Sequence, residues 1–188
     1  MRYEYHRVPG VIRSSSAGTM IQIRRYHPQD GPLLLALFRD TIHRINTRDY
    51  SPEQIDAWAS PDIDELVWTD RFTGRFAWVA EIDRVVAGFT DMTSEGFLDR
   101  LFVSADHQRK GVATALIDRL LNDAAAADIA TIRTNASLTA RPFFESRGFE
   151  AEARQTVDCR GVLMDNFRMK LELPPRQTPP IQPRRNDF

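Results

Sequence analysis

Several features that mark familiar protein classes are missing from this chain of 188 residues. Its single cysteine, Cys159, excludes a disulfide within the chain, which is consistent with a reducing compartment. No apolar run approaches the roughly 20 residues that cross a bilayer, and the N-terminus lacks the apolar core of a signal peptide. We therefore expect a soluble, cytoplasmic protein without a membrane partner.

Neither sign of charge dominates, and the motifs of several enzyme classes are absent. The 25 Lys and Arg residues nearly balance the 26 Asp and Glu residues, which gives no general reason to expect nucleic acid as a partner. The four histidines are scattered, and neither HExxH nor CxxC occurs, so no metal site is predicted. GxSxG, GxxxxGK[ST] and a GxGxxG after the first strand are also missing, which removes the basis for a hydrolase, a P-loop or a dinucleotide site.

The composition and patterning favour one globular domain over residues 20–173. Residues 1–19 show no periodicity and are expected to form a flexible extension. We hypothesise that Met20 is the native start, and an intact mass that includes Met1 would overturn this idea. Residues 174–188 are rich in Pro and Arg, which predicts a disordered tail or, alternatively, a proline-rich docking ligand.

The first half of the domain alternates strand-like and helix-like patterns. A strand is predicted at residues 21–26, followed by a helix that Asp30 caps and that reaches Ile45. Ser51 is predicted to cap a shorter helix, which Pro61 stops. Strands at residues 76–82 and 85–92 are joined by a two-residue turn without glycine, so we expect some strain there. Together with a strand at residues 98–103 they form an antiparallel meander.

The second half continues with a helix after Gly111 and a strand at residues 130–134. Pro142 must lie in the first turn of the next helix, which favours Thr139 over Ser137 as its cap, and Gly148 ends that helix. Two final strands are predicted near residues 150–159 and 162–173. The predicted order is β-α-α-β-β-β-α-β-α-β-β.

Residues 98–121 combine a strand, a polar loop and a helix, and this segment carries the clearest functional signal. The loop places several backbone N–H groups at a helix N-terminus, where unsatisfied donors and partial positive charge bind phosphate. Gly111 lets a ligand approach the main chain, and Ala113 keeps the next turn small. Arg109 and Lys110 either contact the phosphates or lie on a solvated loop.

The hexapeptide QRKGVA, residues 108–113, matches the (Gln/Arg)-x-x-Gly-x-(Gly/Ala) acyl-CoA signature of the GCN5-related N-acetyltransferases. The LFV strand end before it, the segment PFFESRGF and the element order also resemble that family, of which residues 21–173 are identified as a member. Residues 50–59 and 135–145 resemble its YafP-like bacterial subgroup. The resemblance implies an α/β (α+β) fold with a mixed, mostly antiparallel sheet of about seven strands, flanked by about four helices and splayed between strands four and five.

The resemblance also implies that acetyl-CoA is the co-substrate and is bound without a metal. Main-chain groups of Phe102 and Val103 would pair with the pantetheine arm, and an N–H there would polarise the thioester carbonyl. Asn135 would hydrogen-bond the arm or, alternatively, serve as a turn or capping residue. Phe144 would pack beside it. The implied phosphate site comprises Gln108, Arg109, Lys110, Gly111, Val112, Ala113 and Thr114.

The implied reaction is direct attack by a primary amine of a small molecule, peptide or protein on acetyl-CoA in a ternary complex. Asp99 is the candidate base, because counting in twos from Val103 places Leu101, Asp99 and Phe97 on one face of a regular strand. Many relatives carry a Glu base at the position of Phe97. The alternative is that Asp99 is a structural residue, ion-paired with Arg100 or Arg133.

Phe144 stands where many family members place a tyrosine that protonates the departing thiolate. That role is therefore vacant, or it is filled by water, Ser137, Thr139 or Tyr50. The predicted acceptor pocket comprises Phe38, Ile42, Tyr50, Trp58 and Trp68, although Trp58 with Ile55 would equally attach a helix to the sheet.

The leading prediction is an N-acetyltransferase that acts as a monomer or homodimer. A non-catalytic acyl-CoA-binding regulator stays open as an alternative, because the tyrosine is missing and the base is uncertain. An acetyltransferase toxin that modifies aminoacyl-tRNA is a third possibility, against which the near-neutral charge weighs.

Overall fold

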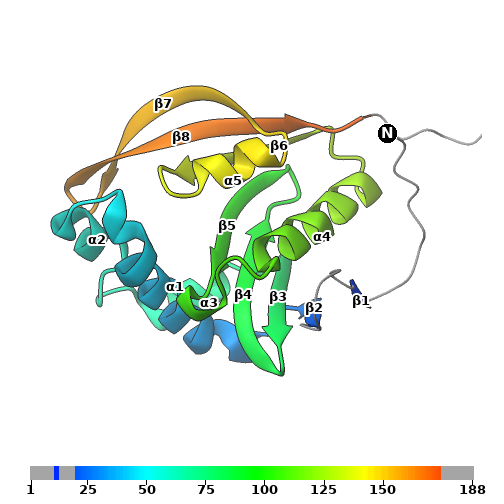
Figure 1. The fold of residues 1–188 in the computed structure, drawn as a ribbon, viewed down its shortest axis with the longest axis horizontal. Coiled ribbons are helices and arrows are strands. Elements are labelled where there is room, and N and C mark those ends of the chain that lie inside the picture. Colours follow the sequence, from blue (N-terminus) through cyan, green and yellow to red (C-terminus); the bar gives the residue numbers. More distant parts are fainter. Residues whose placement is uncertain (1–10, 13–19, 175–188) are drawn as a thin grey trace, which may run out of the picture.

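The computed structural model describes residues 11–12 and 20–174. They form one sheet in the order β1-β2-β3-β4-β5-β6-β8-β7, in which every pairing is antiparallel except that of β5 with β6 (Figure 1). The predicted mixed, mostly antiparallel sheet is therefore confirmed. The strands are β1 Val11–Ile12, β2 Ile21–Arg25, β3 Phe76–Ile82, β4 Val85–Met92, β5 Phe97–Val103, β6 Thr131–Ser137, β7 Glu150–Cys159 and β8 Val162–Glu172.

Five α-helices cover the two faces of the described sheet. They are α1 Gly31–Ile45, α2 Pro52–Trp58, α3 Glu65–Asp70, α4 Val112–Ala126 and α5 Arg141–Ser146. The sheet separates two apolar cores, because neighbouring residues of a strand point to opposite faces. Val79 packs with α1, α2 and α3, whereas Ala80 packs with α4 and α5. Figure 1 shows β7 and β8 as a long ribbon that reaches past the other strands toward α2.

The short strand β1 lies inside the predicted flexible extension. Val11 and Ile12 pair with Gln22 and Ile21 of β2. A two-residue strand is too short to show periodicity, so no sequence pattern predicts it. The rest of residues 1–19, and the predicted tail from residue 175 onward, lie outside the described residues.

Of the two predicted helix caps, only Ser51 makes the capping hydrogen bond. Ser51 caps α2 as expected, since its Oγ accepts from the Gln54 N–H at 3.3 Å and the Gln54 Oε1 accepts from the Ser51 N–H at 3.0 Å. Asp30 is the N-cap residue of α1, as predicted, but its side chain makes no capping hydrogen bond to that helix. Its carboxylate accepts from the His27 N–H at 2.8 Å, which caps the preceding 3-10 turn, and from Arg24 at 2.7 and 2.9 Å.

Helix α3 was not predicted. Asp64 caps it by accepting from the Val67 N–H at 2.9 Å. The helix has only six residues and buries only Trp68, while Leu66 and Val67 are exposed. A helix that buries one side chain shows no apolar spacing, so its pattern was not recognisable.

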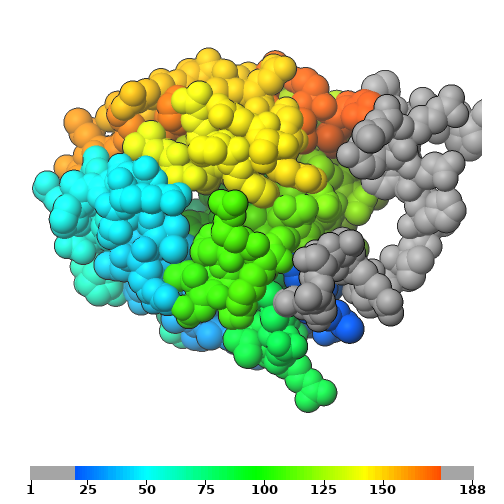
Figure 2. Space-filling model, in the orientation of Figure 1, coloured from blue at the N-terminus to red at the C-terminus, as the bar shows by residue number. Residues whose placement is uncertain are grey.

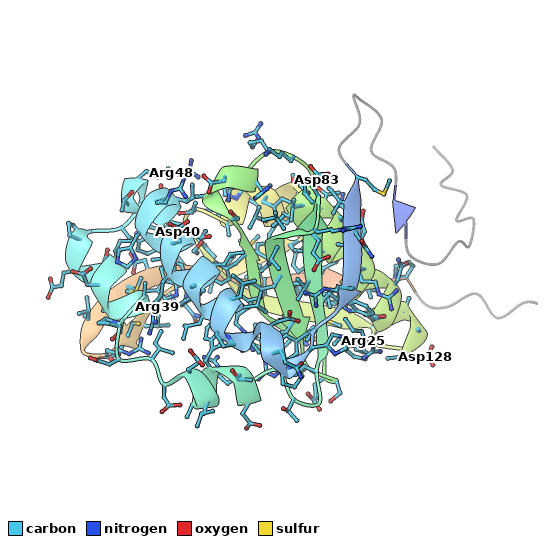
Figure 3. The ribbon with its side chains drawn as sticks, turned by 90° about the horizontal axis from the view of Figure 1, so that it is seen from below. Arg25, Arg39, Asp40, Arg48, Asp83 and Asp128 are labelled. Carbon is cyan, nitrogen blue, oxygen red and sulfur yellow. The ribbon has the colours of Figure 1, made fainter. Side chains whose placement is uncertain are left out.

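The turn between β3 and β4 has the strained geometry that was predicted from its sequence. Asp83 and Arg84 have φ angles of +51° and +65°, which a two-residue hairpin of this kind requires and which glycine adopts more easily. Asp83 lies at the tip of this hairpin (Figure 3).

Strands β5 and β6 separate soon after they meet. Their register pairs only Phe97 with Arg133 and Leu98 with Thr134. Strand β6 is longer than predicted, so Asn135 lies inside it and faces Arg168 of β8. The splay leaves part of the β5 edge without a strand partner, which opens the sheet beside the loop that precedes α4.

The start of α5 corrects the predicted cap. The Ser137 Oγ accepts from the Ala140 N–H at 3.1 Å, whereas the Thr139 hydroxyl is turned toward Asn46 and Asp49. Pro142 lies in the first turn, and Gly148 follows the helix with a φ of +85°, both as predicted. Ala140 is the N-cap residue of α5, and no side chain caps the helix. Ser137 stabilises only the preceding turn, and tertiary hydrogen bonds hold the Thr139 side chain elsewhere.

Candidate active site

A cleft of about 1000 Å³ follows the splay between β5 and β6. Its walls come from these strands, the start of α4, α5 and the segment from α1 to α3, and Figure 2 shows the surface hollowed between α1, α5 and the loop before α4. Ten of the predicted cofactor residues lie in its wall: Phe102, Val103, Gln108, Arg109, Gly111, Val112, Ala113, Thr114, Asn135 and Phe144. Lys110 does not, and its Nζ donates to the Asp106 carbonyl at 3.0 Å.

The loop before α4 has the backbone geometry of an anion site. Arg109 and Gly111 have φ angles of +63° and +87°, and the helix begins at Val112. A Cβ added to Gly111 would come no closer than 3.7 Å to Ile21 Cδ1, so the glycine provides backbone conformation rather than relief from crowding. The Gln108 Nε2 donates to the Val103 carbonyl at 2.7 Å, which ties the loop to the end of β5.

The free edge of β5 presents the main-chain groups of Leu101 and Val103. The Ser104 N–H donates to the Ala87 carbonyl at 2.9 Å, which places the main-chain groups of alternate residues, Phe102 among them, on the β4 side. The main-chain groups of Phe102 therefore face β4 rather than the splay, where they are predicted to pair with the cofactor, and those of Leu101 and Val103 stand at the free edge. Phe102 lines the cleft with its side chain. The Val103 carbonyl already accepts from the Thr41 Oγ1 at 3.2 Å, so Val103 offers its N–H.

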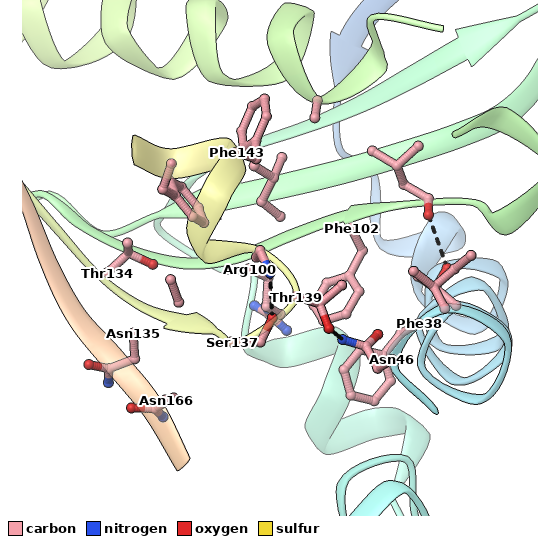
Figure 4. A pocket seen from close by; sticks show the side chains of 18 of the residues that line it. Phe38, Asn46, Arg100, Phe102, Thr134, Asn135, Ser137, Thr139, Phe143 and Asn166 are labelled. Atoms are coloured by element: carbon pink, nitrogen blue, oxygen red, sulfur yellow. Dashed lines mark hydrogen bonds between the residues drawn. The ribbon is translucent and has the colours of Figure 1, made fainter. Parts of the chain in front are cut away.

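Asn135 belongs to a chain of side-chain amides on the strand side of the cleft. The Gln155 Nε2 donates to the Asn135 Oδ1 at 3.2 Å and to the Asn166 Oδ1 at 2.9 Å. Figure 4 shows Asn135 and Asn166 side by side, across the cleft from Phe38 and Phe102. Because Asn135 lies within β6, it is neither a turn nor a capping residue.

Two of the three hydroxyls considered as proton donors are already committed. The Tyr50 hydroxyl donates to the Asp165 carbonyl and accepts from the Leu138 N–H, both at 2.9 Å, and burial raises the pKa of Tyr50. The Thr139 Oγ1 donates to Asp49 at 2.6 Å. The Ser137 Oγ accepts from a backbone N–H, and its own proton has no acceptor among the described residues. Ser137 is therefore the remaining side-chain donor of the three.

Phe144, in place of a tyrosine, is 3% exposed and packs edge-on against Phe149 at 5.0 Å between ring centroids. It also reaches the cleft wall. It brings an apolar surface and no proton to the site.

A β-bulge places Asp99 on a different face from the one predicted. The β4–β5 register moves from Asp91 opposite Arg100 directly to Met92 opposite Leu98, which leaves Asp99 as the extra residue. Leu98 and Leu101 therefore pack in the same core with α4, while Arg100 turns toward α3 with Asp99. The predicted common face of Leu101, Asp99 and Phe97 is wrong, because that count assumed a regular strand.

The Asp99 carboxylate is held by partners that were not predicted. Its Oδ2 accepts from Arg71 at 3.1 Å and from Arg75 at 2.9 Å, and neither Arg100 nor Arg133 binds it. Its Oδ1 has no hydrogen-bond partner among the described residues, and the side chain is 21% exposed in the cleft wall. Asp99 is thus both ion-paired and able to accept a proton.

An aromatic wall lies beside Asp99. Phe102 packs against Phe38 at 4.9 Å and against Trp58 at 6.3 Å between ring centroids. Of the predicted acceptor-pocket residues, Ile42 is fully buried and lies outside the cleft wall. The predicted residues that do line the cleft are Phe38, Tyr50, Trp58 and Trp68.

Within residues 11–12 and 20–174, no group of three or more His, Cys, Asp or Glu side chains could hold a metal ion. No helix in this part of the chain is long and apolar enough to cross a membrane. The Cys159 Sγ lies 3.6 Å from the Ala57 carbonyl.

Comparisons with known proteins agree on one family. A family model described as "Acetyltransferase (GNAT) domain" matches residues 46–173. The uncharacterized N-acetyltransferase YafP of Escherichia coli K12 is 39% identical over 150 residues, which cover 80% of this chain and 95% of that protein.

Solved structures have the same fold. A crystal structure from Rhodopseudomonas palustris, described as "GCN5-Related N-acetyltransferase: Aminotransferase, Class-II", is 34% identical with a TM-score of 0.78, and the match covers 80% of this chain and 94% of that one. The PaiA N-acetyltransferase of Thermoplasma acidophilum, solved in complex with coenzyme A, is 18% identical with a TM-score of 0.64, covering 81% of this chain and 99% of that one.

Proposed function

This chain belongs to the acetyltransferase (GNAT) family, and on that premise we propose that it transfers the acetyl group of acetyl-CoA to a primary amine by direct attack in a ternary complex. One observation carries the proposal. A single cleft joins the loop before α4 to the aromatic and charged end beside Asp99, so a donor and an acceptor fit at the same time. The complex of PaiA with coenzyme A supports the donor.

The loop and the β5 edge fit coenzyme A by their donors. The N–H groups of residues 109–114 stand at the start of α4, where no intrahelical acceptor is available and the helix dipole favours phosphate. The N–H groups of Leu101 and Val103 lie along the splay, where they would hydrogen-bond the pantetheine arm. Bound acetyl-CoA supplies an activated thioester carbonyl, and an N–H of this edge would stabilise the charge that develops on its oxygen.

Asp99 acts on the acceptor in this proposal. An alkyl ammonium with a pKa of about 10 must lose a proton before its nitrogen attacks. Asp99 Oδ1 accepts that proton, directly or through a water molecule. The C–N bond forms as the C–S bond breaks, and the nitrogen then releases its second proton to water. The thiolate takes a proton from water, directly or through Ser137, which water reprotonates. A thiol of pKa about 8.5 leaves readily enough that the missing tyrosine slows the step rather than prevents it.

The test is release of free CoA thiol from acetyl-CoA over a panel of primary amines, with mass spectrometry of the acetylated products. We expect turnover with at least one small-molecule or peptide amine. Tight acetyl-CoA binding by calorimetry without turnover on any amine would overturn the proposal in favour of a regulatory binding protein. Acetylation of aminoacyl-tRNA alone would overturn the stated acceptor class.

A further inference from the structure

Asp99 belongs to a cluster of five charged side chains at the acceptor end of the cleft. Asp91 is fully buried and accepts from Arg100 at 2.6 and 3.0 Å and from Arg75 at 2.9 Å. Arg75 also binds Asp99, which Arg71 approaches from the end of α3. Two carboxylates therefore share three guanidinium groups.

This cluster has one positive charge in excess. Glu95, the next acid near Arg75, is exposed and accepts from the Ser94 hydroxyl at 2.6 Å within its own turn. Water screens an exposed charge far more than a buried one. Arg100 is only 5% exposed and is paired with the buried Asp91 through two hydrogen bonds. The excess charge therefore falls on Arg71 and Arg75, which share Asp99. The excess positive charge is directed at the cleft wall, to which Arg71, Asp99 and Arg100 all belong.

The same wall holds hydrogen-bond donors that the protein does not use. Arg71 is about half exposed, and only its Nη2 makes a hydrogen bond to a described residue. Behind it, Arg100 Nη1 and Trp68 Nε1 are buried with no partner in the described part of the chain. A buried donor without an acceptor destabilises a fold, so two in one wall need a functional or structural explanation.

The phosphates of coenzyme A do not explain these donors. Val103 is four residue steps along β5 from Asp99, a distance of about 13 Å at about 3.3 Å per step, and the loop before α4 lies beyond Val103. The positive cluster and the phosphate loop are therefore separate anion-attracting regions at opposite ends of β5.

We propose that the acceptor amine carries a carboxylate, and that Arg71 binds this group with Arg100 and Trp68 behind it. A planar guanidinium matches a carboxylate through two parallel hydrogen bonds. Trp58 and Phe102 would pack the apolar part of such an amino acid, and Asp99 Oδ1 would face its amine. This inference rests on the proposed acetyl transfer and adds the substrate class.

Matched acceptors test the carboxylate. In each set an amino acid is compared with its carboxamide, its decarboxylated amine and the corresponding aminophosphonate, for example phenylalanine, phenylalaninamide, phenethylamine and the phosphonate analogue. We expect kcat/KM for the acid to exceed that for both neutral members by at least about tenfold. Preference for the members without an acid group overturns the inference but leaves acetyl transfer intact. Preference for the phosphonate overturns the carboxylate assignment. Failure of every amine overturns the proposed function itself.

Variants of Arg71 test whether the preference for acceptors with a carboxylate arises from this part of the cleft wall. In Arg71→Gln the acid-to-amide ratio of kcat/KM should fall by about tenfold, and Arg71→Lys should restore part of it. The matched control is Arg84→Gln at the β3–β4 hairpin, which is exposed, lies outside the cleft wall and should keep the ratio. Calorimetry with acetyl-CoA should give the same affinity for all three variants as for the parent protein. An unchanged ratio in Arg71→Gln, or a loss of acetyl-CoA affinity, would overturn the inference.

Discussion

The two ends of the cleft recognise their ligands with different parts of the chain. At the cofactor end, the donors are main-chain N–H groups of one continuous loop and helix start, and Gly111 sets their direction. At the acceptor end, the charged groups are side chains from β4, β5 and the segment after α3, which the bulge at Asp99 brings together. Main-chain recognition depends on a local backbone shape, whereas side-chain recognition depends on how distant segments pack.

Asp99→Asn should cause the largest change and acts at the acceptor end alone. Without a proton acceptor, kcat should fall by about 100-fold and its pH dependence should flatten, because general-base catalysis contributes at least this much. Acetyl-CoA affinity by calorimetry should stay as in the parent protein. Asp30→Asn removes a carboxylate that is also ion-paired but lies outside the cleft, and it serves as the control. Normal turnover with a lowered melting temperature would make Asp99 purely structural.

Gly111→Val acts at the cofactor end and should weaken acetyl-CoA binding. A β-branched residue avoids a φ of +87°, so the loop must be forced back into its binding shape at a cost of about 2 kcal/mol, which weakens acetyl-CoA binding by about 30-fold. The fold should survive, because space around the added Cβ is open. Gly74→Val is the control, since it carries the same kind of strain at φ +72° outside the cleft wall. Unchanged affinity in the Gly111 variant would show that the phosphates bind elsewhere.

Tyr50→Phe separates architecture from chemistry at the acceptor end. Loss of the hydroxyl leaves the Asp165 carbonyl and the Leu138 N–H without their partner, which should lower the free energy of unfolding by about 1–3 kcal/mol in urea titrations. Tyr26→Phe, whose hydroxyl makes one longer bond to the Thr69 carbonyl at 3.3 Å, should lose less. A stable Tyr50 variant with a large loss of kcat would instead make Tyr50 the general acid.

Ser137→Ala, in the cleft wall, should give the smallest effect. A thiol leaves readily without assistance, so kcat should fall only about threefold to fivefold, with little change in acetyl-CoA affinity. Ser51→Ala likewise removes a hydroxyl that accepts from a backbone N–H, but outside the cleft, and it should leave kcat unchanged. General acid catalysis contributes about 10²-fold or more to a rate. A fall in kcat of that size would make Ser137 essential rather than helpful.

Much of the fold and the backbone shape of the loop before α4 were predictable because their determinants are local. The strands Phe76–Ile82 and Val85–Met92 follow directly from alternation, and the α2 cap follows from the residues Ser51 and Gln54. The loop before α4 was also visible, since its glycine and the following helix start are adjacent in the chain; its role as a phosphate site stays a prediction. Helix α3 was missed because it buries a single side chain, and β1 because it has two residues.

By itself, the sequence determined the order of most elements, the family resemblance and the loop that surrounds Gly111, because each depends on residues that are neighbours in the chain. Only the tertiary structure decided which face Asp99 occupies, since a bulge shifts the alternation by one residue and no local pattern records it. The partners of Asp99 likewise lie 24 and 28 residues away, on segments whose packing against β5 sets the distances. The acceptor end, and with it the carboxylate subsite, exists only once the sheet and α3 have packed together.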